Sequence, residues 1–181
     1  MCKAWLIPWK SMIVTLVLLS VFVVTGPASA SMITFNVALD GAQAGTPSPG
    51  TGAAVLVLDD LAKTLSINLT YADLLSPTTN AHIHCCAEPG VNAAVIIPFI
   101  PAGFVTGSTA GTFLGSFFGL SDTTIAGIES GLSYINIHTV LYPAGEIRGQ
   151  IPPVPEPSTL LLLTSGLAGL GGMAWRRHRR S

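Results

Sequence analysis

The chain has 181 residues, of which 49% are hydrophobic and only 9% are charged. This length allows one domain together with processing segments. Between residues 31 and 153, two basic residues, Lys63 and Arg148, stand against eight acidic ones, which gives a formal charge of −6. Such a segment cannot neutralise a run of phosphates, and this argues against nucleic acid as a partner. The sequence also lacks the phosphate-binding loop G-x-x-x-x-G-K-[ST] and the hydrolase turn G-x-S-x-G.

Residues 1–30 have the three parts of a secretory signal peptide, which we expect to be helical. Lys3 and Lys10 supply a positive start, and residues 12–24 form an apolar run. Ala28 and Ala30 then frame a small-x-small cleavage site. Because the apolar run is short for a membrane helix, we expect signal peptidase to cut after Ala30 and release the chain outside the inner membrane.

Residues 31–151 are typical of an all-β domain, because short apolar runs alternate with turn residues. The expected strands cover residues 33–39, 53–58, 64–71, 81–84, 91–99, 109–120, 132–138 and 146–151. A loop is expected over residues 41–52, and Ser121 is expected to cap a short helix that ends near Glu129. Phe113, Phe117 and Phe118 are expected to pack across a sheet face. Seven or eight short strands suit a β-sandwich or a Greek-key barrel.

Three histidines lie on two of the expected strands of this domain. On a strand, His82 and His84 point to one face and Ile83 to the other. His138 lies on the polar face of a second strand, whose other face holds isoleucines. On the last strand, Glu146 and Arg148 share one face.

Cys85 and Cys86 follow the second histidine directly, and three interpretations stay open. In an oxidising compartment the pair favours a vicinal disulfide that stiffens the loop. The thiols can instead join two chains, or bind Cu(I) or Zn together with the histidines.

A Pro-rich linker over residues 152–158 leads to an apolar helix and a basic tail over residues 159–181. The apolar stretch is just long enough for a transmembrane helix, and the arginines would keep its end cytoplasmic. The linker holds Pro155, Glu156 and Pro157, and the tail holds Arg176, Arg177, Arg179 and Arg180. This order resembles the PEP-CTERM sorting signal of Gram-negative bacteria. The resemblance implies a membrane-anchored intermediate, cleavage by an exosortase near the Pro-Glu-Pro motif, and delivery to the cell surface or the exopolysaccharide matrix.

Three further segments, residues 36–43, 81–84 and 145–150, together resemble the CHRD domain first described in chordin. The likeness runs from about residue 33 to 151. Cys85 and Cys86 depart from it, since many relatives carry glycine or another small residue there. Membership implies an immunoglobulin-like or superoxide-dismutase-like Greek-key sandwich or barrel, and it brings no established activity.

The His-x-His pair with a later histidine also resembles the copper site of Cu/Zn superoxide dismutase. By this analogy His82, His84 and His138 bind Cu or Zn, with Glu146 as a fourth ligand or as an acceptor that orients one ring. Arg148 would then guide a small anion. A bridging histidine and a separate zinc-ligand set are missing, which argues against dismutase activity.

A metal-free interpretation remains beside the metal site. The histidines would bond to Glu146 and Asn136, Arg148 would pair with Glu146 or Asp73, and the network would fix strand register. The sequence therefore predicts an exported surface or matrix protein with a structural or adhesive role, and more readily a binding protein than an enzyme. The alternative is a copper-dependent redox enzyme of dismutase type.

Overall fold

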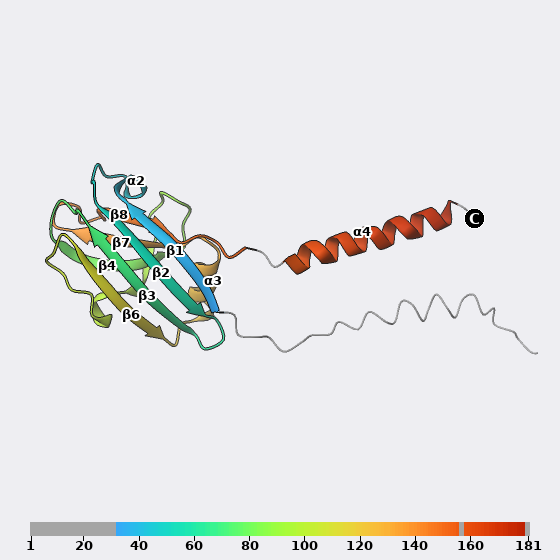
Figure 1. Ribbon diagram of the computed structural model, residues 1–181, viewed down its shortest axis with the longest axis horizontal. Helices are drawn as coiled ribbons and strands as arrows, with labels where there is room; N and C mark the ends of the chain where they lie inside the picture. Colours follow the sequence, from blue (N-terminus) through green and yellow to red (C-terminus); the bar gives the residue numbers. More distant parts are fainter. Residues whose placement is uncertain (1–31, 156–157, 180–181) are drawn as a thin grey trace, which may run out of the picture.

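The computed structural model describes residues 32–155 and 158–179 (Figure 1). The expected signal peptide lies outside these residues, as do Glu156, Pro157 and Arg180. Eight antiparallel strands form one curled sheet, and this confirms the all-β prediction. The strands are β1 (Met32–Asp40), β2 (Thr51–Asp59), β3 (Thr64–Ala72), β4 (Thr78–Cys85), β5 (Ala94–Pro98), β6 (Gly111–Phe118), β7 (Tyr134–Thr139) and β8 (Ile147–Gln150). Four helical segments accompany them: α2 (Gly41–Ala44), the 3₁₀ turn η1 (Ile100–Ala102), α3 (Asp122–Glu129) and α4 (Ser158–His178).

The strand order across the sheet is β5-β4-β7-β8-β1-β2-β3-β6. Three connections therefore cross between its halves: β3 to β4, β5 to β6, and β6 to β7 through α3. The curl brings the two edge strands, β5 and β6, close to each other, although they do not pair. Phe99, just after β5, stacks on Phe113 of β6 with ring centroids 4.9 Å apart. The core fills the inside of this curl.

Alternation of apolar and polar residues explains why the strands form. In β3, Leu65, Ile67, Leu69 and Tyr71 are buried and the residues between them are exposed. β4 and β7 differ, because residues on both of their faces are buried. The second face of β4 and β7 is the one that carries the histidines, and it is covered by other parts of the chain.

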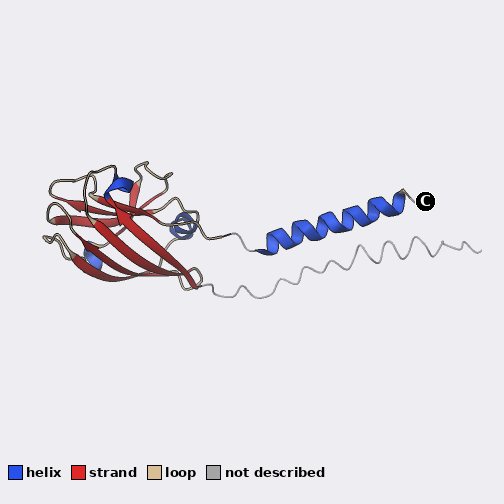
Figure 2. Ribbon diagram, turned by 45° about the horizontal axis from the view of Figure 1, so that its top comes forward, coloured by secondary structure: helices blue, strands red, loops and turns tan. Residues whose placement is uncertain are grey.

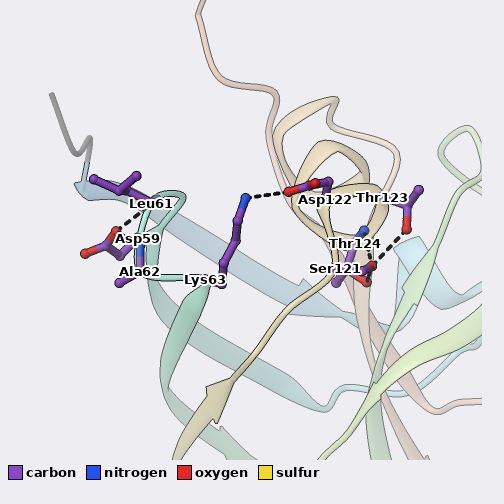
Figure 3. A network of polar contacts seen from close by, with 8 residues as sticks. All are labelled: Asp59, Leu61, Ala62, Lys63, Ser121, Asp122, Thr123 and Thr124. Carbon is purple, nitrogen blue, oxygen red and sulfur yellow. Dashed lines mark hydrogen bonds and ion pairs between the residues drawn. The ribbon is translucent and has the colours of Figure 1, made fainter. Parts of the chain in front are cut away.

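A polar network joins the β2–β3 turn to the start of α3 (Figure 3). The Asp59 carboxylate accepts hydrogen bonds from the backbone N–H groups of Leu61 and Ala62 at 3.1 and 2.7 Å. Lys63 forms an ion pair with Asp122. Ser121 caps α3 as expected, because its hydroxyl accepts from the N–H of Thr124 at 3.1 Å.

The structure corrects the expected elements at two places. The loop expected after β1 begins with α2, because the Asp40 side chain accepts from the N–H of Gln43 at 2.7 Å and Gly45 ends the turn at φ 71°. Phe118 does not pack on the sheet and is 77% exposed. Phe117 already points inward, and successive side chains on a strand face opposite ways.

The helix expected near the C-terminus forms as α4 and stands clear of the sheet (Figure 2). It carries four glycines and has Arg176, Arg177 and His178 in its last turn. The transmembrane helix expected over residues 159–181 is not found: among the described residues, no helix combines the length and the hydropathy needed to cross a membrane.

The aromatic contact between the sheet edges yields a stability prediction. Phe113→Ala removes a buried ring that touches Phe99 and Phe104, and we expect the free energy of unfolding to fall by about 3–5 kcal/mol. Phe118→Ala removes an exposed ring from the same strand and should change it little. Urea denaturation followed by circular dichroism measures both. Equal losses for the two variants would contradict the packing described here.

Candidate metal centre

The pairing of β4 with β7 brings the three predicted histidines together. His82 lies opposite Asn136, and His138 lies two residues further along β7, so His138 is a diagonal neighbour of His82. Ring centroids are 5.0 Å apart for His82 and His138, 5.5 Å for His82 and His84, and 5.9 Å for His84 and His138. Each residue offers one nitrogen, and these atoms lie within 4.8 Å of one another. Because zinc–nitrogen bonds measure about 2.0–2.1 Å, a small inward movement of the rings would let one ion bind all three.

Backbone carbonyls determine which nitrogen of two rings is free. His84 Nδ1 lies 2.9 Å from the carbonyl oxygen of Ala93, and His138 Nδ1 lies 2.9 Å from that of Pro143. A carbonyl only accepts, so each Nδ1 carries the proton and each Nε2 keeps its lone pair. His84 Nε2 is buried and has no hydrogen-bond partner. The lone pair of His84 Nε2 is therefore available to bind a metal ion.

The third ring completes a short contact within the cluster. His82 Nδ1 lies 3.1 Å from His138 Nε2. Because Nε2 of His138 has the lone pair, Nδ1 of His82 donates when no metal is bound. A bound cation would displace that proton to His82 Nε2 and use both lone pairs.

All three imidazoles are shifted toward the neutral form that binds metals. Burial, followed by the neighbouring His138 and His84, lowers the pKa of His82 to about 4. Burial also lowers the pKa values of His84 and His138, although the bonds to Ala93 and Pro143 oppose the shift. At neutral pH the rings are therefore mostly uncharged, and protonation competes little with a metal ion.

Aromatic and cationic side chains form a stack beside the cluster. The His84 ring lies parallel to that of Tyr134, with centroids 4.8 Å apart. The Arg148 guanidinium carbon lies 3.3 Å from the Tyr134 centroid. Since β7 lies between β4 and β8, Tyr134 separates the histidine from the arginine. Tyr134 shares the face of Asn136 and His138 by simple alternation, so the sequence held a signal for it.

The segment after β4 covers this face. Cys85 and Cys86 are joined to each other by a disulfide in the structure, and Gly127 of α3 lies so close to both sulfurs that a Cβ would not fit. Further along, the N–H of Ala93 donates to the Tyr134 hydroxyl at 3.0 Å, and Arg148 donates to the carbonyl of Val91 at 3.0 Å. The same segment therefore orients His84 and holds the stack in place.

Glu146 lies apart from the histidines, contrary to its expected role as a ligand or as an acceptor for a ring. Its carboxylate is fully buried and accepts from the hydroxyls of Ser48 and Thr139 and the N–H of Leu75, each at 2.6 Å. Burial raises its pKa, but these bonds outweigh burial and hold the pKa below its usual value. Glu146 is thus an ionised anchor between two loops and β7.

The other expected polar pairs are also wrong. Within residues 32–155 and 158–179, Arg148 has no ion pair with Glu146 or Asp73. Arg148 instead donates to Val91 and to the Gln150 side chain. Asn136 donates to the carbonyl of Ala144, not to a histidine. The histidines use carbonyls of loops, which side-chain patterns in a sequence do not reveal.

Two glycines explain the spacing of the last motif. Gly145 has φ 122°, and a Cβ there would collide with the amide of Asn136. A Cβ on Gly149 would lie 2.6 Å from the carbonyl oxygen of Ala38 on the neighbouring strand. Gln43 from the first motif accepts from the N–H of Gln150 at 3.0 Å. The first and last motifs therefore meet on β1 and β8, and β7 lies between the last motif and the second motif on β4.

The fold and site define a curled β-domain with a histidine cluster, followed by a short linker and a helix that ends in arginines. Residues 35–151 match the family model described as the CHRD domain, and residues 153–180 match the PEP-CTERM protein-sorting motif. The chain belongs to the CHRD domain family and carries an exosortase sorting signal, so it is an exported protein destined for the cell surface or the extracellular space. Neither the curated proteins nor the solved structures gave a significant match.

The lowered pKa values predict a pH dependence of the metal-free chain. Below about pH 6.5 the histidines of the unfolded chain bind protons, whereas His82 in the folded cluster stays neutral down to about pH 4. The free energy of unfolding should therefore fall as the pH drops below 6.5. Urea midpoints in the presence of a chelator, between pH 7 and about 5, test this before the carboxylates titrate. His82→Asn should flatten the slope, and His178→Asn in the tail should leave it unchanged. A slope equal in all three proteins would contradict the assignment.

Glu146 yields a separate prediction. Glu146→Gln keeps the shape but replaces one acceptor oxygen by a donor, so we expect the free energy of unfolding to fall by about 1.5–3 kcal/mol. The control is Asp122→Asn, which alters an exposed carboxylate and should have little effect. Because Glu146 does not touch the cluster, the slope between pH 7 and about 5 should persist. Loss of that slope in Glu146→Gln would indicate that Glu146 does contact the histidine cluster.

Proposed function

We propose that this protein is a structural or adhesive component of the cell surface or extracellular matrix, and that its CHRD domain binds one Cu or Zn ion through His82, His84 and His138. The observation that carries the metal site is His84 Nε2, a buried lone pair without a partner that faces two other imidazoles. A buried polar atom is costly unless something satisfies it. Imidazole nitrogens are ligands that both metals accept.

The chemistry around the cluster supports this proposal. Two rings are held by carbonyls in the tautomer that frees Nε2, an arrangement common around metal ligands. Three imidazoles leave room for a fourth ligand from solvent or substrate. The segment that follows the disulfide lies against one side of the site, since Ala93 bonds to His84 and to the Tyr134 hydroxyl.

We also propose a route to the surface. Signal peptidase would cut after Ala30, and an exosortase would then cut near Pro155 while the tail holds the chain at the inner membrane. The match to the sorting motif supports exosortase processing. The anchored intermediate and the matrix partner belong to this proposal.

A dismutase-like Greek-key barrel is the finer fold that we favour. Its support is the curl that brings β5 and β6 together and the three connections that cross between the halves of the sheet. The same three imidazoles favour a second candidate function, a copper-dependent redox enzyme. That enzyme requires turnover of superoxide by the copper-loaded chain, whereas the matrix role requires none.

Metal loading tests the site directly. After exposure to Cu(II) or Zn(II) and removal of the unbound metal, the full chain should retain one metal ion per chain, as measured by elemental mass spectrometry. His84→Ala should lose it, because this change removes the buried ligand nitrogen. His178→Ala, a histidine outside the cluster, should keep it. Retention by His84→Ala, or no binding by the original chain, would overturn the metal proposal.

A further inference from the structure

A polar cavity of about 170 Å³ lies on the histidine-bearing face of the sheet, beside Arg148 and Asn136. α2, the segment before β5 and the turn before β8 form its other walls. The wall residues are Ala42, Gln43, Ala44, Gly45, Gly90, Asn92 and Ala144. At about 30 Å³ for each water molecule, the space suits five or six waters or one small organic molecule. Arg148 is the one charged residue that lines it.

Arg148, which lines the cavity, has unused hydrogen-bonding capacity. It is 4% exposed, and two of its N–H groups donate, one to Val91 and one to Gln150. A guanidinium has five N–H donors in a planar fork that matches a carboxylate. A buried cation without an anionic partner is unfavourable. The cavity therefore offers a strong donor group to a negatively charged oxygen.

Asn136 also lines the cavity and has an unpartnered acceptor. Its amide nitrogen donates to Ala144 at 3.0 Å, but its Oδ1 is buried and has no partner. Gln43 differs, because its side chain bonds to Ala38, Asp40 and Gln150 and is fully used. A guest that suits the cavity must accept from Arg148 and donate to Asn136.

We propose that this cavity binds a small hydroxylated carboxylate, with the carboxylate on Arg148 and a hydroxyl that donates to Asn136 Oδ1. The charge of the domain favours a single carboxylate over a polyanion, because residues 31–153 carry −6 and would repel a run of charges. The same chemistry comes from a free hydroxy acid or from an acid sugar unit of a polysaccharide. The site needs no metal, so it stands independently of the histidine cluster.

Calorimetric titration of the full chain with a chelator present tests the proposal. Glucuronate should bind, and glucose and acetate should bind at least about tenfold more weakly, because each lacks one of the two groups. Glycolate distinguishes the sources: binding equal to glucuronate indicates a free hydroxy acid, and weaker binding indicates an acid sugar. Binding of glucose or acetate equal to that of glucuronate would overturn the proposal.

Variants locate the site. Arg148→Gln should weaken glucuronate binding about tenfold or more, whereas Lys63→Gln removes a positive charge on the β2–β3 turn and should leave it unchanged. Since Arg148→Gln also disturbs the stack on Tyr134, Asn92→Trp supplies a second variant. Asn92 is exposed and lines the cavity, so we expect a bulky ring there to reduce the space for a ligand. Unchanged affinity in Asn92→Trp and Arg148→Gln would overturn the assignment. Metal loading is measured separately, so failure here leaves the metal proposal intact.

Discussion

The register of β4 against β7 is the constraint on which the site depends. It places Ile83 opposite Ile135 in the core and His82 opposite Asn136 on the other face. A slip of one residue would turn the histidines into the core and the isoleucines out of it. Burial of these isoleucines therefore specifies the position of the imidazoles, and the hydrophobic effect assembles the site as a consequence of folding.

The chain segments that cover the histidine-bearing face of β4 and β7 determine the burial and the tautomer of His84. On an open sheet face His84 would be solvated, whereas here its Nε2 is buried and the segment after the disulfide holds its Nδ1 on a carbonyl. The same segment contacts Tyr134 and Arg148. One loop thus sets a ring tautomer, a stack and the wall of the cavity beside Asn136.

The sequence predicted most of what alternation governs. Strand alternation correctly placed the core isoleucines and the shared face of the three histidines, and local signals correctly placed the Ser121 cap. It failed where partners come from distant loops. The expected contact of Glu146 with the histidines was wrong because Ser48, Leu75 and Thr139 satisfy its carboxylate. Arg148 stacks on Tyr134 instead of pairing with an acid. These partners come from segments that meet only in the folded chain, and the spacing of residues along the sequence does not reveal which segments meet.

X-ray absorption spectroscopy of the zinc-loaded full chain tests the central claim most directly, because it counts the atoms bound to the metal. The account predicts three imidazole nitrogens at about 2.0–2.1 Å, with one oxygen from water in the remaining position. A shell made mainly of oxygen, or one that contains sulfur, would show that the three rings do not hold the ion together.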